Sequence, residues 1–572
     1  MRNLTTIAFL MATTSLASAA SNESFVAQIG ASNSAVVGQT NGNNKQATIQ
    51  AGKKNTAITS QNNPSSPSKT NQSGIGQFGA HNNALVGQDG GNNTQGTLQV
   101  GVGNNAVTSQ GGATGNKTNN SGTAQFGYKN DSLVGQNGGN NDSTTLQVGG
   151  KNASITGQQT NQHNSGKNDS TTAQFGWGNN AATSQNSAGS TDGSNGKKGG
   201  TGGDNTSGIL QNGYGNTALV GQNSVGSGQT GNNGQGGNPK AGVDNNSGVV
   251  QFGGKNFASV SQDGQRKGVN TNLSNDSFVG QFGWYNQALV GQLGGNNTQG
   301  TLQFGAHNNA ITGQSATDTG GTNGAFTLQG GYGNQALTSQ TTTGSTGWFN
   351  SASGGDNSAA TLQFGKGNKA TTGQDASGIV VPGPFNIPFA LGGVDNNALT
   401  LQVGKGNSAL TAQSGGSLFP SSNNSAIAQF GGGNDAIVGQ VNGGNVQGTL
   451  QAGYKNTAAT GQTGSKSGLG TNASLTIQAG AKNSAVTSQS IANPLNVGVN
   501  GSLIAQFGAN NKAIVGQSDT GLQPMIGANL QTTVQVGNGN SALTSQVASA
   551  AVSNTSVTAQ FGSHNTAITV QK

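Results

Sequence analysis

The segment QFGAHNNALVGQ, residues 77–88, decides how the rest of the chain is interpreted. With its first Gln as position zero, it has Gly at +2, Asn at +5, Ala at +7 and Gln at +11. This spacing occurs twenty times, and only Ser132 and Ser154 replace the Ala. The twenty copies begin at Gln28, Gln50, Gln77, Gln99, Gln125, Gln147, Gln174, Gln211, Gln251, Gln281, Gln303, Gln329, Gln363, Gln402, Gln429, Gln451, Gln478, Gln506, Gln535 and Gln560. Such self-similarity indicates a stacked repeat protein rather than several globular domains.

Each copy contains two short segments with the pattern of β-strands. Position −6 is Asn in every copy, position −2 is Val, Ile or Thr, and position +9 is Val or Thr. β-branched residues that recur with a period of two are typical of strands. The four residues between +2 and +7, such as AHNN at 80–83, are turn-forming types and are expected to form the turn. All five tyrosines, Tyr128, Tyr214, Tyr285, Tyr332 and Tyr454, stand at +3 or +4.

The spacing between copies predicts a solenoid. Five neighbouring pairs of copies are 22 residues apart, and the longest spacing is 40 residues. Every extra residue falls between +11 of one copy and −6 of the next, as expected when loops extend from one edge of stacked coils. We therefore predict an all-β fold for residues 21–572, a β-solenoid of two-sheet strand–turn–strand coils with about 20 rungs and cross-β, amyloid-like stacking.

The face that carries positions −4, −2 and 0 of the first strand and +7, +9 and +11 of the second strand is expected to point to the interior. Where +9 is Thr, −2 is Thr in all twelve rungs, and where +9 is Val, −2 is Val or Ile in seven of eight, Thr123 being the exception. Such matching is expected if the two side chains touch. Position −4 is usually Ser or Ala, and the copies that differ carry Gln46, Gln95, Gln299, Gln447 and Gln531.

An interior of this kind is polar and needs hydrogen bonds. Rungs about 4.8 Å apart allow each Gln or Asn amide to bond to its copy in the next rung. We expect a self-assembly ladder that includes, in the outer copies, Gln28, Asn33, Gln39, Gln50, Asn55, Gln61, Gln77, Asn82, Gln88, Gln99, Asn104, Gln110, Gln535, Asn540, Gln546, Gln560, Asn565 and Gln571. The outward positions are less polar than a solvated surface should be. Position +8 is apolar except at Ser259 and Thr371, and +1 is Phe in ten rungs, so lateral contacts are expected.

The N-terminus predicts export. Residues 1–20 combine Arg2, an apolar run from Leu4 to Leu16 and a small-residue stretch at 17–20, the pattern of a secretory signal peptide. The run is too short to span a bilayer, and no later stretch is apolar enough, so no membrane span is expected. The 23 Lys and Arg residues form no cluster typical of a nucleic-acid interface, and no nucleic-acid partner is expected. The chain has no Cys, which excludes disulfides and thiolate chemistry.

Catalytic chemistry has little support. His81, His307 and His564 occupy the +4 turn and His163 lies in an insert, positions typical of solvated residues. Asp131 and Asp435 at +6 more plausibly limit aggregation than act as acids. Neither a phosphate-binding loop nor calcium-binding nonapeptides occur. We expect no catalytic residue, no cofactor and no metal site, and hence no enzyme.

The five repeated positions, as in Gln77, Gly79, Asn82, Ala84 and Gln88, closely resemble the curlin repeat of curli fibre subunits. The resemblance covers nearly the whole chain after residue 21. It implies a homopolymeric, fimbrium-like amyloid fibre at the surface of a Gram-negative bacterium, with roles in adhesion and biofilm matrix. It also implies a nucleator subunit and an outer-membrane secretion pore as partners. The chain departs from curli subunits in its many more repeats, in Asn at −6 where they often have Ser, and in its lack of their export-targeting segment.

Three classes of function remain open from the sequence. A self-assembling fibre protein is favoured because the last copy ends at Gln571 without a polar cap, and open strand edges template another chain. The alternative is a monomeric surface β-solenoid, an adhesin or ligand-binding protein that presents its loops or tyrosine-bearing turns. Ice binding is disfavoured because the regular threonines face inward. A polysaccharide-cleaving β-helix enzyme would need a cluster of acids or bases that the sequence lacks. The long inserts near 186–204 and 375–395 are assigned no role.

Overall fold

The computed structural model describes residues 22–64, 69–113, 117–160, 166–189, 202–226, 242–264, 273–317, 321–346, 351–382, 388–417, 419–466, 469–491, 497–520, 527–549 and 552–572. The expected signal peptide and His163 therefore lie outside the described residues, as do parts of both long inserts. The described segments form strands and no helix. The chain divides into two compact units, Met1–Gln162 with six rungs and His163–Lys572 with fourteen. The predicted all-β solenoid with about 20 rungs is confirmed.

Each rung contributes one strand to a first sheet and the next strand to a second sheet. In the N-terminal unit the first sheet holds β1 (Asn22–Ala31), β3 (Asn43–Lys53), β5 (Thr70–Ala80), β7 (Asn93–Val102), β9 (Asn119–Tyr128) and β11 (Asn141–Gly150). The second sheet holds β2 (Ser34–Thr40), β4 (Thr56–Asn62), β6 (Asn83–Gly90), β8 (Asn105–Ala113), β10 (Asp131–Asn137) and β12 (Ala153–Thr160). Neighbouring strands within each sheet are parallel.

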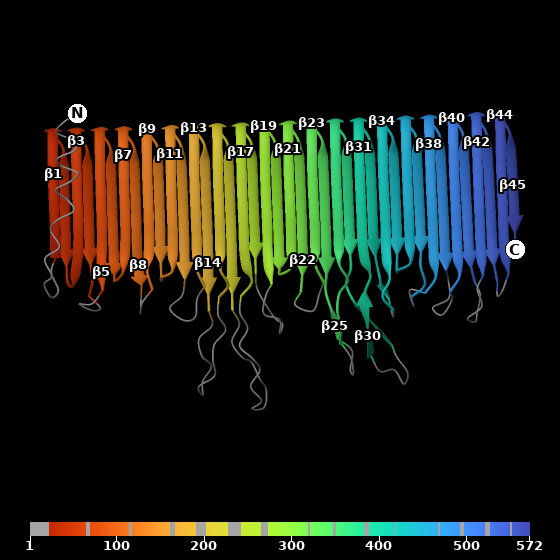
Figure 1. The fold of residues 1–572 in the computed structure, drawn as a ribbon, viewed down its shortest axis with the longest axis horizontal. Coiled ribbons are helices and arrows are strands. Elements are labelled where there is room, and N and C mark those ends of the chain that lie inside the picture. Colours follow the sequence, from red (N-terminus) through yellow and green to blue (C-terminus); the bar gives the residue numbers. More distant parts are fainter. Residues whose placement is uncertain are drawn as a thin grey trace. The chain divides into compact units, whose positions relative to one another are not determined.

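The C-terminal unit repeats this arrangement (Figure 1). Its first sheet holds β13 (Asn168–Trp177), β15 (Asn205–Tyr214), β17 (Asp244–Gly254), β19 (Ser274–Trp284), β21 (Asn297–Ala306), β23 (Asn323–Tyr332), β27 (Asn357–Lys366), β31 (Asp395–Lys405), β34 (Ser422–Gly432), β36 (Asn445–Tyr454), β38 (Thr471–Ala481), β40 (Val499–Ala509), β42 (Ala528–Asn538) and β44 (Ser553–Ser563). Its second sheet holds β14 (Asn180–Ala188), β16 (Thr217–Val225), β18 (Phe257–Asp263), β20 (Gln287–Gly294), β22 (Asn309–Ala316), β24 (Gln335–Thr342), β28 (Lys369–Asp375), β32 (Ser408–Ser414), β35 (Asp435–Val441), β37 (Thr457–Thr463), β39 (Ser484–Ile491), β41 (Lys512–Asp519), β43 (Ser541–Ala548) and β45 (Thr566–Gln571).

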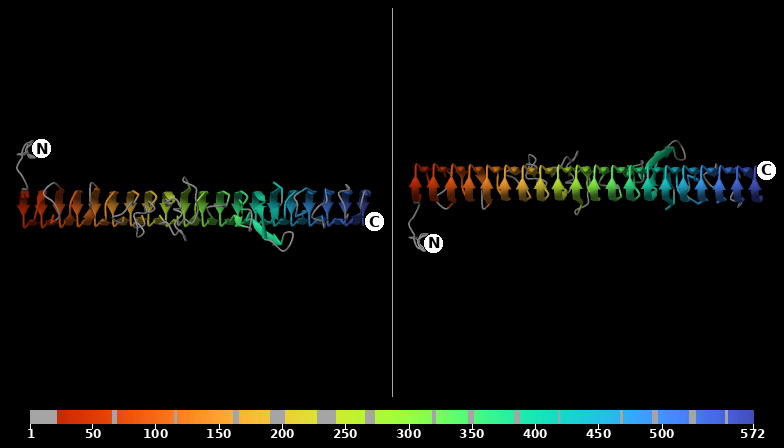
Figure 2. Two further views of the ribbon diagram at one scale, coloured as in Figure 1. Left: turned by 90° about the horizontal axis from the view of Figure 1, so that it is seen from below. Right: turned by 90° about the horizontal axis from the view of Figure 1, so that it is seen from above.

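The sequence repeat and the strand register coincide. Position zero pairs with position zero, so that Gln28 lies beside Gln50 and Gln50 beside Gln77. Viewed along the strands, the rungs of each unit follow one another in chain order (Figure 2). Short antiparallel strands occur in the inserts. Strand β25 (Ser345–Thr346) pairs with β26 (Ser351–Ala352), and β29 (Ile379–Pro382) pairs with β30 (Pro388–Gly393), which also pairs with β33 (Gly416–Ser417). Figure 1 places β25 and β30 at the edge from which the inserts leave.

The face that carries −4, −2 and 0 on the first strand and +7, +9 and +11 on the second points to the interior, as the sequence predicts. Gln77, Asn82 and Ala84 are at most 1% exposed. The matched −2 and +9 positions meet there, since Ile427 and Val438 belong to one buried apolar cluster, and Ile75 and Val86 to another. The matching of these two positions along the sequence is thus explained by side-chain contact across the rung.

The turn between the two strands is tighter than expected. Only two residues, at +4 and +5, separate β5 from β6, whereas the sequence suggested four. Gly at +2 has a positive φ in every rung, and at Gly79 an added Cβ would lie 2.1 Å from the carbonyl oxygen of Gly101. Position +4 is also left-handed, for example His81 with φ 58°. The left-handed backbone conformations at +2 and +4 reverse the chain within a short turn. The Asn side chain at +5 donates hydrogen bonds to main-chain carbonyl oxygens at this turn, as Asn82 does to Phe78 and Gly101.

Candidate self-assembly surface

The glutamines at position zero form continuous hydrogen-bonded ladders inside each unit. Gln402 Nε2 donates to Gln429 Oε1, and Gln429 Nε2 donates to Gln451 Oε1, both at 2.8 Å. The second hydrogen of Gln429 Nε2 goes to the main-chain oxygen of Ser408 at 2.8 Å. Because both amide hydrogens and the oxygen are used, a fully buried Gln costs little in this setting. The glutamines at +11 behave in the same way, as Gln440 Nε2 to Gln462 Oε1 at 2.8 Å shows.

The asparagine ladders run in the opposite direction along the chain. Gln amides donate to the following rung, whereas Asn55 Nδ2 donates back to Asn33 Oδ1 at 3.2 Å. At the other end of the sequence, Asn565 Nδ2 donates back to Asn540 Oδ1 at 2.9 Å. The Asn at +5 also donates to main-chain oxygens, as Asn565 does to Phe561 at 2.8 Å. The sequence predicted the ladders but carried no signal for their direction.

The residues that the sequence singled out fall into two groups. A first group is buried at 2% exposure or less between neighbouring rungs: Gln50, Asn55, Gln61, Gln77, Asn82, Gln88, Gln99, Asn104, Gln110, Gln535, Asn540 and Gln546. Gln28, Asn33, Gln39, Gln560, Asn565 and Gln571 belong to the end strands β1, β2, β44 and β45. The structure places all of them on the expected ladders within the chain, and their role in self-assembly stays a prediction.

The two end rungs carry complementary hydrogen-bonding groups. At the C-terminal rung, Gln560 Nε2 and Gln571 Nε2 each donate to a main-chain oxygen and, among the described residues, have no further Gln to bind. At the N-terminal rung, Gln28 and Gln39 donate forward, and no Gln of the described residues donates to their Oε1 atoms. Donors therefore lie at one end and acceptors at the other, and the Asn ladders are complementary in the opposite sense.

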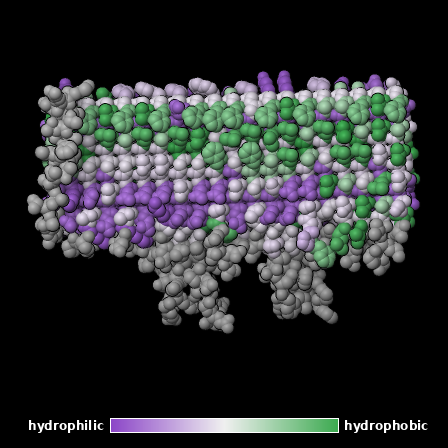
Figure 3. Space-filling view, viewed as in Figure 1, coloured by the Kyte–Doolittle hydropathy of each residue, from purple (hydrophilic) through white to green (hydrophobic). Residues whose placement is uncertain are grey.

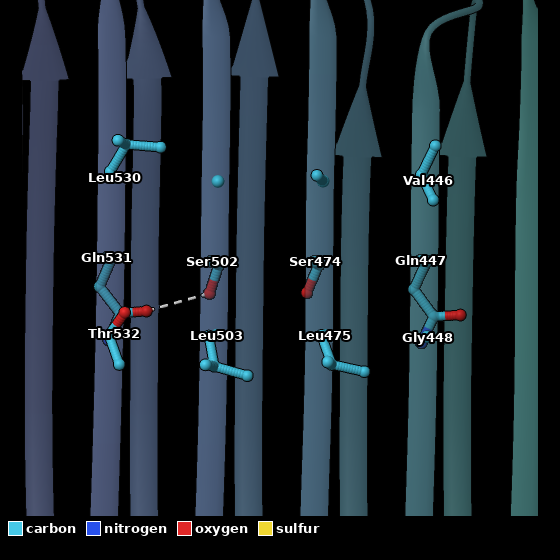
Figure 4. Close-up of a pocket in the computed structure, with 12 residues that line it drawn as sticks. Val446, Gln447, Gly448, Ser474, Leu475, Ser502, Leu503, Leu530, Gln531 and Thr532 are labelled. Carbon is cyan, nitrogen blue, oxygen red and sulfur yellow. Dashed lines mark hydrogen bonds between the residues drawn. The ribbon is translucent and has the colours of Figure 1, made fainter.

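The five Gln residues at −4 have partners that the sequence analysis missed. Ser502 Oγ donates to Gln531 Oε1 at 3.1 Å, the dashed line in Figure 4, and Gln531 Nε2 donates to Thr533 Oγ1. The other four copies repeat this Ser–Gln–Thr arrangement. The signal in the sequence is a Ser at −4 of the preceding rung together with a Thr two residues after the Gln.

Other buried hydroxyls lack such a partner. The Oγ1 atoms of Thr123 and Thr487 are buried and have no hydrogen-bond partner among the described residues. Thr123 is the residue whose partner across the rung is a Val, Val134, rather than a Thr. A buried hydroxyl without a partner costs about 1–3 kcal/mol. The −2/+9 pairs therefore tune the stability of the rung, whereas the amide ladders fix the register.

The turn edge gathers aromatic and cationic side chains. The rings of Tyr285 and His307 stack with centroids 5.0 Å apart, and Tyr332 contacts His307 at the same distance. Lys255 Nζ donates to the Tyr285 hydroxyl at 2.8 Å, and this hydrogen bond raises the pKa of Lys255. Lys366 lies over the Tyr332 ring, 5.4 Å from its centroid. These contacts join aromatic and cationic side chains of neighbouring rungs along the turn edge.

Comparison with known proteins adds no family. No family model matches the chain, and no curated protein matches it in a sequence search. Within the described ranges, His, Asp and Glu side chains nowhere gather in a group of three or more that could hold a metal ion. None of the segments that the structure describes forms a helix with the length and hydrophobicity of a membrane span.

Proposed function

We propose that the chain is a secreted structural subunit that assembles head to tail into an extracellular, curli-like amyloid fibre for adhesion and biofilm matrix. The observation that carries this proposal is the complementarity of the end rungs. Gln560 and Gln571 present Nε2 donors in the positions along the rung where Gln28 and Gln39 of a second copy present Oε1 acceptors. Docking the ends would continue both ladders in register.

The exposure of the last rung also supports docking. Phe561 is 69% exposed and Ile568 68%, whereas Phe507 and Leu543, at the same repeat positions, are 41% and 40% exposed. A further rung stacked on β44 and β45 would remove this difference. Such a rung would also pair the main-chain edges of both strands, which an open sheet otherwise offers to any chain. Two C-terminal ends would bring donor against donor, so the fibre would be polar.

Dilution of the chain from denaturant tests the proposal. We expect fibres by electron microscopy, thioflavin fluorescence, a meridional reflection at about 4.8 Å, and faster assembly when fibre fragments are added. A stable β-rich monomer that does not assemble when fibre fragments are added would refute the fibre function. That result would favour the second candidate, a ligand-binding surface solenoid, for which the stacked Tyr285, His307 and Tyr332 are the supporting observation.

A further inference from the structure

The outer face of the second sheet carries a ridge beside a groove. The ridge is position +8, where ten of the fourteen rungs in the C-terminal unit have Val, Ile or Leu, such as Leu337 and Ile437, 42% and 45% exposed. The groove is position +10, which is Gly or Ser in eighteen of twenty rungs. The face turned to the viewer in Figure 3 is that of the first sheet, where outward apolar side chains also gather in bands.

No neighbour among the described residues requires the glycines at +10. The glycines there, for example Gly291, Gly373 and Gly439, have no positive φ, and an added Cβ would meet nothing within 4 Å. Gly in the interior of a strand weakens it and often marks a place where a ligand or another backbone approaches closely. Val is tolerated at this position in the last rung, at Val570. The neighbouring outward column at +6 accepts side chains as large as Phe257, so the limit on size is specific to +10.

We propose that this face binds the same face of a second copy of the chain, around a two-fold axis parallel to the stacking direction. An axis that passes beside position +9 exchanges +8 with +10, so each ridge enters the groove of the other copy. Both copies have the same spacing of about 4.8 Å between rungs, so the fit repeats at every rung. Because the axis lies along the stack, both copies also point in the same direction.

The same axis exchanges +6 with +12 and so predicts a charge pair. In the rung that contains β28, +6 is Lys369 and +12 is Asp375. When equal rungs face each other, Lys369 of each copy lies opposite Asp375 of the other. Within one chain these residues stand at opposite ends of β28, about 20 Å apart, and cannot pair. The other charges at +6 and +12 of the C-terminal unit face uncharged residues in this arrangement.

The area of the face is sufficient for a stable pair. A strip from +6 to +12 is about 20 Å wide, and fourteen rungs at about 4.8 Å give about 1,300 Å² on each copy. Standard interfaces between stable partners bury about 800 Å² on each side. The face carries three Lys and three Asp in the C-terminal unit, so it has no net charge to oppose self-association. The pairing uses a surface separate from the end rungs and does not depend on fibre growth.

Carbodiimide coupling of the full chain tests the proposal, because this reagent joins amines and carboxylates that are in contact. We expect an intermolecular isopeptide bond between Lys369 and Asp375, identified by mass spectrometry in the soluble chain or in fibres. The variant with Gly313→Val, Gly373→Val and Gly439→Val should lose this bond, and its mass per unit length in fibres, or its mass in solution, should halve. Gly208→Val is the matched control, since its Cβ would also meet open space but on the other sheet.

The outcomes separate this proposal from the fibre function. A triple variant that still forms fibres with half the mass per length supports the lateral pair and the fibre together. A soluble wild-type dimer that never forms fibres but yields the bond supports the pair and refutes the fibre. Absence of the Lys369–Asp375 bond in the wild type, or a triple variant with unchanged mass, would overturn the pairing, whatever happens to fibre growth.

Discussion

The direction of the glutamine ladders predicts that the same substitution acts differently at the two ends of the chain. In Gln560→Glu with Gln571→Glu, each side-chain oxygen still accepts from the preceding Gln, at 2.7 Å from Gln535 and 2.6 Å from Gln546. The Nε2 donors that would reach an incoming copy are replaced by carboxylate oxygens. These would face the Oε1 acceptors of the next chain, and growth at this end should stop.

The expected loss of affinity between chain ends follows from the two lost hydrogen bonds. Each end contact forfeits a hydrogen bond and sets two acceptors against each other, which we take as about 1.5–3 kcal/mol per position. Two positions give about 3–6 kcal/mol, so end docking should weaken by about 10²–10⁴-fold. The assay is the elongation rate of wild-type seeds supplied with variant monomer, followed by thioflavin fluorescence.

The control is the same change at the other end, Gln28→Glu with Gln39→Glu. These carboxylates still accept from the incoming Nε2 donors, and because they lie in the end strands β1 and β2, they can remain solvated. We expect elongation within about tenfold of the wild type. Below the ordinary glutamate pKa of about 4.3, the C-terminal variant regains a donor as its carboxyls protonate, so growth should return at about pH 3. Equal inhibition at both ends, or no recovery in acid, would refute the ladder polarity.

Five further substitutions test the packing of the rungs. Gln429→Leu leaves buried amide groups unpaired in both neighbouring rungs and should lower the free energy of unfolding by about 3–5 kcal/mol, measured by denaturant titration. Thr123→Val removes a hydroxyl without a partner and should raise the free energy of unfolding by about 1 kcal/mol. Thr449→Val removes a hydroxyl that accepts a hydrogen bond and should lower the free energy of unfolding by a similar amount. If both variants changed the free energy of unfolding in the same direction, the hydrogen-bond assignment would be wrong. Gly431 has a φ of 106°, and a Cβ added there would lie 2.1 Å from a carbonyl oxygen. Gly431→Ala should therefore lower the free energy of unfolding by about 2–4 kcal/mol. In Gly439→Ala the added Cβ meets open space, so the denaturation midpoint should be nearly unchanged.

Much of the fold was accessible from the sequence because the repeat is short and strict. A period of two places residues on faces, and the matched −2 and +9 positions identified the buried face before any coordinates, as the cluster of Ile427 and Val438 confirms. The confinement of insertions to one interval likewise predicted the edge from which β25 and β30 leave. These features depend only on local geometry that recurs in every rung.

The set of rungs, their inward residues and the need for amide ladders can all be derived from the repeat, because buried polar groups must be hydrogen-bonded. The tertiary structure alone decided the direction of each ladder, since an amide can donate either way and its main-chain partner, such as Ser408 for Gln429, sets the choice. It also decided which glycines have a conformational role: Gly79 must adopt a positive φ under a neighbouring carbonyl, whereas Gly439 opens on free space. Glycines that are indistinguishable by residue type thus differ in physical role, because only their neighbours in three dimensions distinguish a turn from an open surface.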